Sequence, residues 1–365
     1  MKILTIFGTR PEIIRLSLII KILDRSCEHF IVHTGQNFQE NLSDVFFDEL
    51  GIRAPDRNLE IRGSSFGEQA GDLFSKIETV FDEVQPDRIL ILGDTNSALS
   101  SIVAARRRIP VFHMEAGNRC FDDRVPEEVN RRIIDHSSTI LLPYTSRSKE
   151  NLVREGIERD RIFITGNPIF EVLESFKKEI DDSPMMLKLG ISHQEYFLAT
   201  IHRAENVDHK ARLTSIFAAF DKIATEFKKP VLVSVHPRTA DKLSTFGMSV
   251  DQQRVRLLNA MPFLSFVNLE KNAFMVLSDS GTVQEECAIF GVPNVTVRDV
   301  TERPETIECG SNIIGGTQTE SIISAVGYVA SRVSEWTAPF EYLVPNVSHT
   351  VCNILLGRLS LRDHH

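Results

Sequence analysis

The sequence alternates short apolar runs with longer segments of helical spacing, and this alternation limits the fold more than any other feature of the chain. Apolar runs that are bounded by turn residues and separated by helical patterns predict βαβ units. In the first half we expect strands at residues 2–7, 30–33, 88–92, 111–114, 140–142 and 161–165. Repeated βαβ units give a parallel, doubly wound sheet with helices on both faces, so the expected class is α/β.

The same alternation restarts after a pause between residues 166 and 183. In the second half we expect strands at residues 196–201, 231–235, 256–258, 274–277 and 294–297. A chain of 365 residues is long enough for two domains with separate cores. We therefore expect two similar α/β domains, over 1–167 and 170–350, and a C-terminal helix or tail over 351–365.

Charge and cysteine content argue against several classes of protein. The net charge of −9 argues against binding to nucleic acid or a membrane surface, because such proteins carry a basic footprint. The one basic run, Arg106–Arg108, is expected to end a helix, where cations complement the helix dipole. The five cysteines are odd in number and show no zinc or disulfide spacing, so we expect no metal and a reducing, cytoplasmic location. No apolar run approaches the length of a membrane span.

Acidic residues follow the expected strand at 111–114 and open the next helix. Glu115 comes directly after the strand, at the edge of the sheet where α/β proteins bind ligands. A carboxylate there has no capping task and is costly to bury unpaired, so we interpret Glu115 as functional. Pro126 fits the first position of a helix, and Glu127 and Glu128 in that first turn complement the helix dipole. These two acids are therefore either functional residues or helix-cap residues.

Polar loops also follow the first and third expected strands. Residues 8–12 combine a glycine, Arg10 and a helix opened by Pro11, which suits an anionic group at a helix N-terminus. This loop is neither the G-x-G-x-x-G fingerprint nor a Walker A motif, so it supports neither a nicotinamide cofactor nor ATP. After the strand at 88–92, Asp94 is either functional or the N-cap of the next helix.

The second half carries its own set of polar loops. His202 and His236 each follow an expected strand, and each has an arginine within two residues. Ser280 and Gly281 follow another strand and resemble a second anion site at a helix N-terminus. Together these loops predict a cleft between the two domains and a ligand that is linked through a diphosphate.

With these blocks in order, the chain resembles the non-hydrolysing UDP-N-acetylglucosamine 2-epimerases over nearly its whole length. The blocks that carry the resemblance are Phe7–Glu12, His33–Gln36, Gly93–Thr95, Glu115–Gly117, Pro126–Arg131, His202–Arg203, Asp279–Glu286 and Thr301–Glu305. The resemblance implies a GT-B-like fold of two facing Rossmann-like domains, with the active site in the interdomain cleft and UDP bound by the second domain. It also implies a homodimer.

The family's reaction uses neither a metal nor a nicotinamide, and we expect no cofactor here. Anti elimination of UDP with loss of the C2 proton gives a 2-acetamidoglucal, and UDP adds back after protonation from the other face. Such a reaction needs a base on one face of the sugar, an acid on the other, and cations on the departing diphosphate.

The resemblance also assigns roles to single residues. It implies that the catalytic residues are Asp94, Glu115, Glu127 and His202. It implies that the UDP-sugar is bound by Arg10, Arg15, His236, Ser280, Gly281, Glu286 and Arg303, with Glu286 on the ribose hydroxyls. Which acid serves as base for which epimer stays open, and Arg303 could also be only the residue before a helix that starts at Pro304. Arg15 stands where the family usually has lysine, which replaces a point ammonium by a planar fork.

The sequence leaves two UDP-sugars open as the substrate. The resemblance implies interconversion of UDP-N-acetylglucosamine and UDP-N-acetylmannosamine for cell-surface polysaccharide precursors. The loop Gly117–Pro126 and Thr282 look more like the branch that acts on UDP-2-acetamido-2,6-dideoxy-L-talose. Phe121 in that loop could pack on a 6-methyl group or belong to the core. Gly35–Asn37 reads Gly-Gln-Asn where allosterically activated members have Gly-Gln-His, which puts the allosteric site in doubt.

A UDP-sugar glycosyltransferase of the same two-domain architecture is the alternative from another class. It would bind the same donor but would transfer the sugar to an acceptor. The presence of Asp94, Glu115 and Glu127 in one domain favours the epimerase, because an inverting transferase needs one base there rather than several acids.

Overall fold

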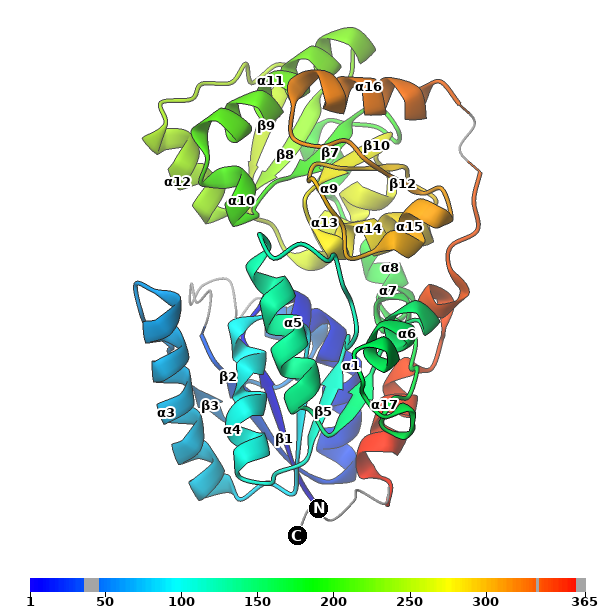
Figure 1. Ribbon diagram of the computed structural model, residues 1–365. Coiled ribbons are helices and arrows are strands. Elements are labelled where there is room, and N and C mark those ends of the chain that lie inside the picture. Colours follow the sequence, from blue (N-terminus) through cyan, green and yellow to red (C-terminus); the bar gives the residue numbers. More distant parts are fainter. Residues whose placement is uncertain (36–45, 333–334, 359–365) are drawn as a thin grey trace. The chain divides into compact units, whose positions relative to one another are not determined.

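The computed structural model describes residues 1–35, 46–332 and 335–358. Within it the chain forms two compact units. The first unit contains Met1–Ser175 together with the chain from Glu341 onward, and the second contains Phe176–Phe340. Each unit is built on one parallel sheet with helices packed on it (Figure 1).

The described residues of the first unit form a six-stranded parallel sheet in the order β3-β2-β1-β4-β5-β6. Its strands are β1 (Lys2–Phe7), β2 (Glu28–His33), β3 (Arg57–Asn58), β4 (Arg88–Leu92), β5 (Val111–Met114) and β6 (Ile140–Leu142). Its helices are α1 (Arg10–Ser26), α3 (Phe66–Val84), α4 (Ser100–Arg106), α5 (Pro126–Ser137), α6 (Ser146–Arg154), α7 (Ile169–Ser175) and α17 (Val347–Leu356). Three short 3-10 turns are η1 (Asn96–Leu99), η2 (Arg159–Arg161) and η3 (Phe340–Leu343).

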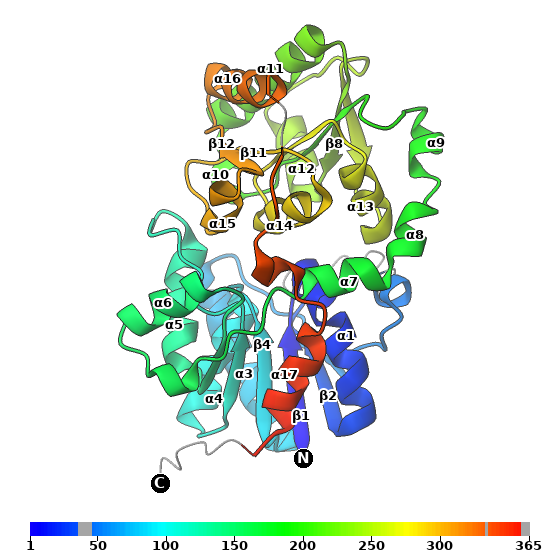
Figure 2. The ribbon, with the colours of Figure 1, turned by 90° about the vertical axis from the view of Figure 1, so that its right-hand side faces the viewer.

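Helices cover both faces of this sheet. Leu4 and Ile6 of β1 pack in one core with Ile77 and Phe81 of α3 and Ile134 of α5. Helices α1 and α17 contact each other and lie on the opposite face (Figure 2). This layering is the reason that the strands read as continuous apolar runs rather than as an alternating pattern.

The strand order of the first unit reverses between β1 and β4, where Thr5 pairs with Leu90. The loops after these two strands leave the same edge of the sheet at a topological switch point, which is where open α/β sheets bind ligands. Arg10 begins α1 directly after the first of these loops, and Asp94 stands in the second.

The described residues of the second unit form a six-stranded parallel sheet in the order β12-β11-β10-β7-β8-β9. Its strands are β7 (Phe197–Thr200), β8 (Val231–Val235), β9 (Val255–Asn259), β10 (Met275–Ser278), β11 (Asn294–Thr296) and β12 (Asn312–Ile314). Its helices are α8 (Lys177–Asp181), α9 (Met185–Leu189), α10 (Ala204–Val207), α11 (Lys210–Phe227), α12 (Pro237–Thr245), α13 (Phe263–Lys271), α14 (Gly281–Phe290), α15 (Pro304–Glu308) and α16 (Thr319–Ala330).

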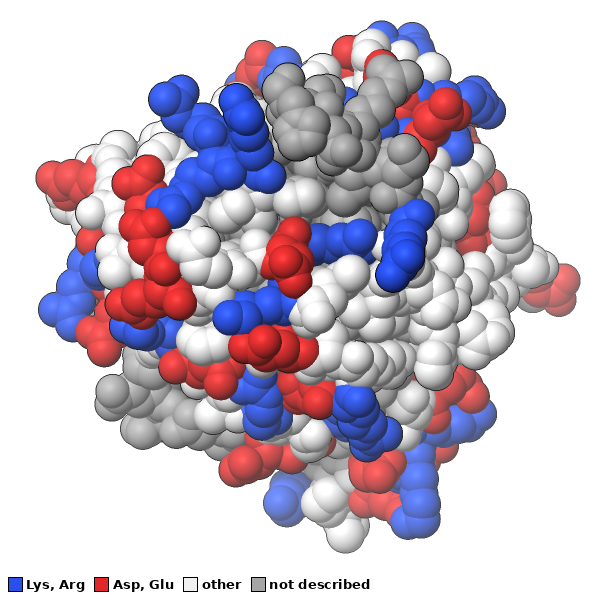
Figure 3. Space-filling model, turned by 90° about the horizontal axis from the view of Figure 1, so that it is seen from below, with Lys and Arg blue, Asp and Glu red and all other residues white. Residues whose placement is uncertain are grey.

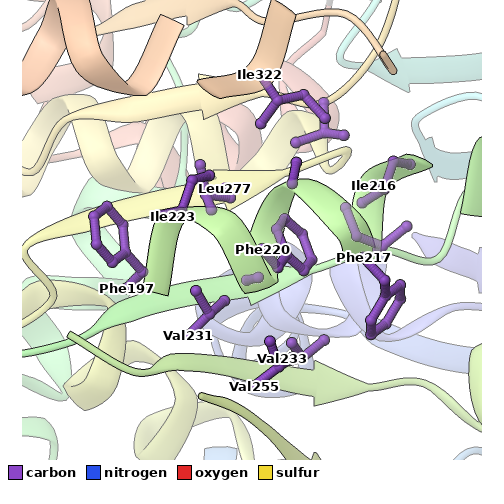
Figure 4. Close-up of a cluster of buried hydrophobic side chains, with 14 of the residues drawn as sticks. Phe197, Ile216, Phe217, Phe220, Ile223, Val231, Val233, Val255, Leu277 and Ile322 are labelled. Carbon is purple, nitrogen blue, oxygen red and sulfur yellow. The ribbon is translucent and has the colours of Figure 1, made fainter. Parts of the chain in front are cut away.

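Counted from its own first strand, the second sheet has the same order as the first, and its reversal falls between β7 and β10. Figure 4 shows part of the core on one face of this sheet, where Phe197 of β7 and Leu277 of β10 pack with Phe220 and Ile223 of α11. All four side chains are buried. The core fixes the two strands whose ends carry His202 and Asp279.

Most strand predictions are confirmed, and β1, β4, β5, β6 and β8 have the expected bounds. The strand expected at 161–165 is wrong. This segment begins at the end of η2 and makes only an isolated bridge between Leu141 and Ile162. The expected strands omit β3 and β12, because edge strands of two and three residues are too short for a periodic signal.

The expected boundaries 170–350 and 351–365 are also corrected. The chain returns to the first unit at Glu341, whose carboxylate accepts a hydrogen bond from the hydroxyl of Ser146 at 3.0 Å. At the start of α17, the backbone N–H of Ser348 donates to Glu171 at 2.8 Å. The reason is burial, since α17 covers α1 with the buried side chains Val351 and Leu355 (Figure 2).

Acidic and basic side chains are interspersed on the face drawn in Figure 3. The expected helix end at Arg106 is confirmed, since α4 ends there. Within the described ranges, no helix combines the length and the apolar composition that a membrane crossing requires.

Candidate active site

Glu115 directly follows β5 in a left-handed backbone conformation, with a φ of 65°. Its backbone N–H donates to the carbonyl of Leu142 on the neighbouring strand at 3.1 Å. Its carboxylate accepts hydrogen bonds from the hydroxyl of Tyr144 and the amide of Asn118, each at 3.4 Å. The prediction that this carboxylate is held on ordered backbone at a strand end is confirmed.

The turn after Glu115 depends on a glycine. Gly117 has a φ of 80°, and a Cβ at this position would lie 2.2 Å from the carbonyl oxygen of Ser148. Any side chain here would collide with α6. The close approach of α6 therefore fixes the path of the chain beyond Glu115.

Asp94 follows β4. The interpretation of Asp94 as the N-cap of the next helix is wrong. The residue at the N-cap of η1 is Thr95, not Asp94. The carboxylate of Asp94 instead accepts a hydrogen bond from Nε of Arg131 at 2.8 Å, and its backbone carbonyl accepts from Asn130 at 3.0 Å. Its side chain is 20% exposed, so one charged oxygen is paired while the group still reaches solvent.

The two acids at the start of α5 differ in their surroundings. Pro126 occupies the first helical turn as expected. Glu128 is buried and accepts from the backbone N–H groups of Cys120 at 3.0 Å and Phe121 at 2.9 Å. Glu127, one residue earlier, is only partly buried. Glu128 therefore clamps the loop that precedes the helix, whereas Glu127 is less deeply buried.

Arg131 connects Glu128 to Asp94. Its Nη1 donates to Glu128 at 2.6 Å, while its Nε donates to Asp94. Burial disfavours the charged form of Glu128, but the hydrogen bond from Cys120 and the Arg131 charge outweigh burial and lower its pKa. The ion pair thus ties the start of α5 to the loop after β4.

A second buried network joins the loops after β4 and β5. His113 lies with Nδ1 2.9 Å from Asp135 and with Nε2 2.8 Å from the carbonyl oxygen of Gly93. The other oxygen of Asp135 accepts from the backbone N–H of Gly117 at 3.2 Å and from Arg119 at 2.7 Å. Burial opposes ionisation of Asp135, but His113 and Arg119 outweigh it and lower its pKa.

The sequence predictions did not include this network. One signal was present, because His113 is a polar residue inside an otherwise apolar strand. The partner Asp135 stands 22 residues further along the chain, and only the fold brings it to the strand.

The loop after β1 is held by a capping box. The backbone N–H groups of Gly8 and Thr9 donate to Glu12 at 2.6 and 2.8 Å, and the hydroxyl of Thr95 donates to it at 2.6 Å. Burial raises the pKa of Glu12 to about 7 in spite of these donors. Glu12 thereby links the switch-point loops after β1 and β4.

Two of the three arginines expected to bind the ligand, Arg10 and Arg15, lie in the first two turns of α1. The guanidinium of Arg10 lies over the ring of Phe46, 5.2 Å from its centroid, and burial lowers its pKa. Arg15 is 2% exposed. The prediction about the allosteric site concerns Gly35, Gln36 and Asn37. Of these three residues, Gln36 and Asn37 lie outside the described part of the chain.

In the second unit, the structure brings His202 and His236 together, with ring centroids 6.4 Å apart. The buried carboxylate of Asp279 holds the His202 loop. It accepts from the backbone N–H groups of His202 at 3.1 Å and Arg203 at 3.0 Å, and from the amide of Asn206 at 3.0 Å. Nδ1 of His202 lies 3.2 Å from the same carboxylate, which fixes the orientation of the ring.

The start of α14 is crowded on one side. Ser280 is its N-cap residue, and the hydroxyl of Ser280 lies 3.0 Å from that of Thr282. A Cβ on Gly281 would lie 2.5 Å from Oε1 of Glu302, so this position has no room for a side chain. Backbone N–H groups at such a helix start can bind an anion, and a side chain at Gly281 would require the carboxylate of Glu302 to shift.

Arg303 and Glu286, the last two residues of the expected binding set, are both buried. Arg303 is the N-cap residue of α15, whose first helical residue is Pro304, and its guanidinium is ion-paired with Glu285. The expected helix start at Pro304 is thus present, and Arg303 has a carboxylate partner within its own unit. Glu286 lies on α14 beside the buried Glu270 of α13.

These loops supply the groups that proton transfer and diphosphate binding need. The first unit presents the carboxylates Asp94, Glu115 and Glu127 near the strand ends. The second presents two imidazoles and a helix start at its own switch point. Ionisable groups of this kind can move protons, and cations with backbone N–H groups can stabilise a departing anion.

Comparison with known proteins defines the class first. The glycosyltransferase WaaG, which is involved in lipopolysaccharide biosynthesis, matches with a TM-score of 0.57 at 11% identity and covers 99% of this chain and 96% of its own. At this identity the match shows the fold alone. The expected GT-B-like class of two doubly wound parallel sheets is confirmed.

The family follows from closer matches. The family that matches residues 21–356 is described as UDP-N-acetylglucosamine 2-epimerase. The UDP-N-acetylglucosamine 2-epimerase of Methanocaldococcus jannaschii is 41% identical over 348 residues, which is 93% of this chain and 95% of that protein. The chain belongs to the UDP-N-acetylglucosamine 2-epimerase family, whose members are isomerases, as the sequence predicts.

Two further matches bear on the ligand. The crystal structure of the M. jannaschii enzyme in complex with UDP-GlcNAc and UDP matches with a TM-score of 0.93 at 39% identity, over 98% of this chain and 99% of that one. The UDP-2,3-diacetamido-2,3-dideoxy-D-glucuronate 2-epimerase of Pseudomonas aeruginosa is 37% identical, over 93% of this chain and 99% of that protein. These relatives therefore act at C2 of UDP-sugars that differ in the rest of the ring.

Proposed function

We propose that this protein interconverts UDP-N-acetylglucosamine and UDP-N-acetylmannosamine by elimination and re-addition of UDP. The observation that carries the proposal is the match to the relative that binds UDP-GlcNAc and UDP, at 39% identity over nearly the whole of both chains. The arrangement of acids at the strand ends of the first unit agrees with this chemistry, since loss of the C2 proton requires a base and its return requires an acid.

We assign the proton transfers to Asp94, Glu115, Glu127 and His202. Asp94 is held by Arg131 and Glu115 by Tyr144, and both acids are only partly buried. His202 is oriented by Asp279. Fixed orientation is what a general acid or base needs, because it must meet the C–H bond within hydrogen-bonding distance.

We assign binding of the UDP group to residues of both units that are cationic, lie at helix starts or can accept from a diol. These residues are Arg10, Arg15, His236, Ser280, Gly281, Glu286 and Arg303. The helix start at Ser280 provides backbone N–H groups for a phosphate, and a carboxylate such as Glu286 can accept from both ribose hydroxyls.

The sugar itself is tested by comparing substrates. The relatives described above give no specific support to the 6-deoxy-L-talose branch, because they are named for UDP-N-acetylglucosamine and for UDP-2,3-diacetamido-2,3-dideoxy-D-glucuronate. Phe121 is 74% exposed, so the interpretation of Phe121 as a core residue is wrong. The P. aeruginosa relative shows that a third UDP-sugar deserves the same assay.

The decisive experiment follows exchange at C2 in heavy water. Purified protein is incubated with UDP-N-acetylglucosamine, UDP-2-acetamido-2,6-dideoxy-L-talose or UDP-2,3-diacetamido-2,3-dideoxy-D-glucuronate, and deuterium at C2 is measured by NMR. We expect incorporation into UDP-N-acetylglucosamine together with formation of its C2 epimer, and the highest kcat/KM for this sugar. A higher kcat/KM for either of the others would reassign the substrate. UDP release that requires an added acceptor, without exchange, would favour the glycosyltransferase.

We further propose that the protein is a homodimer and that it works in the cytoplasm. All five cysteines are free thiols in the structure, which suits a reducing compartment. Light scattering in solution tests the dimer, and a mass equal to that of one chain would contradict it.

A further inference from the structure

Two carboxyl groups of the second unit meet inside the protein. Glu270 near the end of α13 is fully buried, and Glu286 on α14 is 4% exposed. The carboxyl group of Glu286 lies close to that of Glu270, near enough for a hydrogen bond once one of the two is protonated. The thiol of Cys287, the residue after Glu286, lies 3.4 Å from Oε1 of Glu270.

A hydrogen bond between two carboxyl groups requires a proton on one of them. Two ionised carboxylates in contact repel each other strongly in a protein interior, so one of them keeps its proton. Oε2 of Glu270 is buried, and in the described part of the chain no donor reaches it. A proton on Oε2 of Glu270 would donate to Glu286. It would remove the repulsion between the two carboxyl groups and would give Oε2 a hydrogen-bond partner.

The neighbouring thiol fits the same arrangement. Burial raises the pKa of Cys287 well above its ordinary value, so its S–H remains available as a donor to Oε1 of Glu270. Burial, followed by the charge of Glu286, likewise raises the pKa of Glu270. One proton on Glu270 and one on Cys287 therefore satisfy the three groups without any buried like-charge pair.

We propose that Glu270 is a positioning residue that holds a proton and donates it in a hydrogen bond to Glu286, which keeps Glu286 ionised and oriented toward the ribose hydroxyls. This inference rests on the proposed function, which gives Glu286 the ribose of UDP. An ionised Glu286 accepts from both hydroxyls of the diol, whereas a protonated one would offer one acceptor fewer. Glu270 acts through Glu286 and does not itself touch the ligand.

The test measures how well the protein distinguishes UDP from 2′-deoxy-UDP. Titration calorimetry gives the ratio of the two dissociation constants for the wild type and for three variants. We expect the wild type to prefer UDP, and Glu286→Ala to remove the preference. Glu270→Leu should reduce the preference by about tenfold, the size of one lost hydrogen bond to a charged group, with little change for 2′-deoxy-UDP. Glu270→Gln should retain it, because its amide N–H can donate to Glu286.

The ratio separates failure of this inference from failure of the proposed function. A preference that is unchanged in Glu270→Leu but lost in Glu286→Ala would overturn the role of Glu270 and leave the ribose assignment intact. An unchanged preference in Glu286→Ala would overturn both.

If Glu270→Leu does not fold, the pH dependence of the ratio decides. The titratable groups that face Glu270 are Glu286 and Cys287, and both are present in Glu270→Gln. We expect the wild-type preference to fall at alkaline pH, where Glu270 loses its proton, and the Glu270→Gln preference to stay level. Parallel curves for the two proteins would overturn the inference.

Discussion

At the residue scale, the acids of the first unit have two distinct tasks. Glu128 and Asp135 are buried and accept from backbone N–H groups and arginines, so their charge holds the loops. Asp94, Glu115 and Glu127 are only partly buried and stand at the strand ends or the start of α5. This difference in surroundings is why we assign only Asp94, Glu115 and Glu127 to chemistry.

The first prediction concerns the three partly buried acids. Asp94→Asn, Glu115→Gln and Glu127→Gln should each lower kcat by roughly a hundredfold or more, the scale of a lost acid–base group. Circular dichroism should show the fold retained. Glu150→Gln, at an exposed position of α6, is the matched control and should keep full activity. Variants that melt early but keep their activity per folded molecule would show that these acids are structural.

At the scale of elements, the active-site loops are joined by side chains from α5. Arg131 binds the loop after β4, and Asp135, one turn further along the helix, binds the turn after β5. Glu12 adds a third link from the start of α1 to the loop after β4. The loops are therefore fixed to the helices, which suits a site that needs fixed geometry.

The second prediction tests the link through Asp135. Asp135→Asn removes a buried charge that faces Arg119 and His113, and breaking such a pair should cost about 3 kcal/mol or more. The lowered pKa of Asp135 also makes its contribution depend on pH. It is fully present above the pKa of the unfolded chain and is lost as pH falls through the lower folded pKa.

Urea unfolding at several pH values checks both parts of this prediction. We expect the variant to be less stable near neutral pH and the difference from the wild type to shrink in acid. A difference of constant size across the acid range would show that the charge of Asp135 is not its source.

At the scale of the whole molecule, the two units repeat one strand order, 3-2-1-4-5-6 when each is counted from its own first strand. Each therefore has its own switch point, with cationic or acidic groups on the loops that leave it.

The third prediction concerns ligand stabilisation. UDP at about a hundred times its dissociation constant should stabilise the fold by about 2.7 kcal/mol and raise the melting temperature by a few degrees. Uridine without the diphosphate should produce a smaller shift. Arg10→Ala should reduce the shift at a fixed UDP concentration, because the guanidinium is assigned to the diphosphate. No shift with UDP at millimolar concentration would count against the binding assignments.

The sequence by itself determined the strands and the chemistry at their ends. Buried parallel strands leave a continuous apolar run, so β4, β5 and β8 could be predicted to the residue. The residues after each run then stand at the edge where α/β sheets bind ligands, which is why Glu115 and His202 could be proposed as site residues without a structure. The strands and the residues that follow them depend on short stretches of sequence, so the sequence alone was enough to predict them.

Only the tertiary structure decided how distant residues meet. The pairing of His113 with Asp135 and of Glu270 with Glu286 depends on helices that pack beside the site, and neither spacing signals contact. The same holds for the return of the chain at Glu341, because α17 is buried by α1, more than 300 residues earlier in the sequence. Burial of apolar surface drives distant segments to pack together, and no local pattern records which surfaces will be buried against each other.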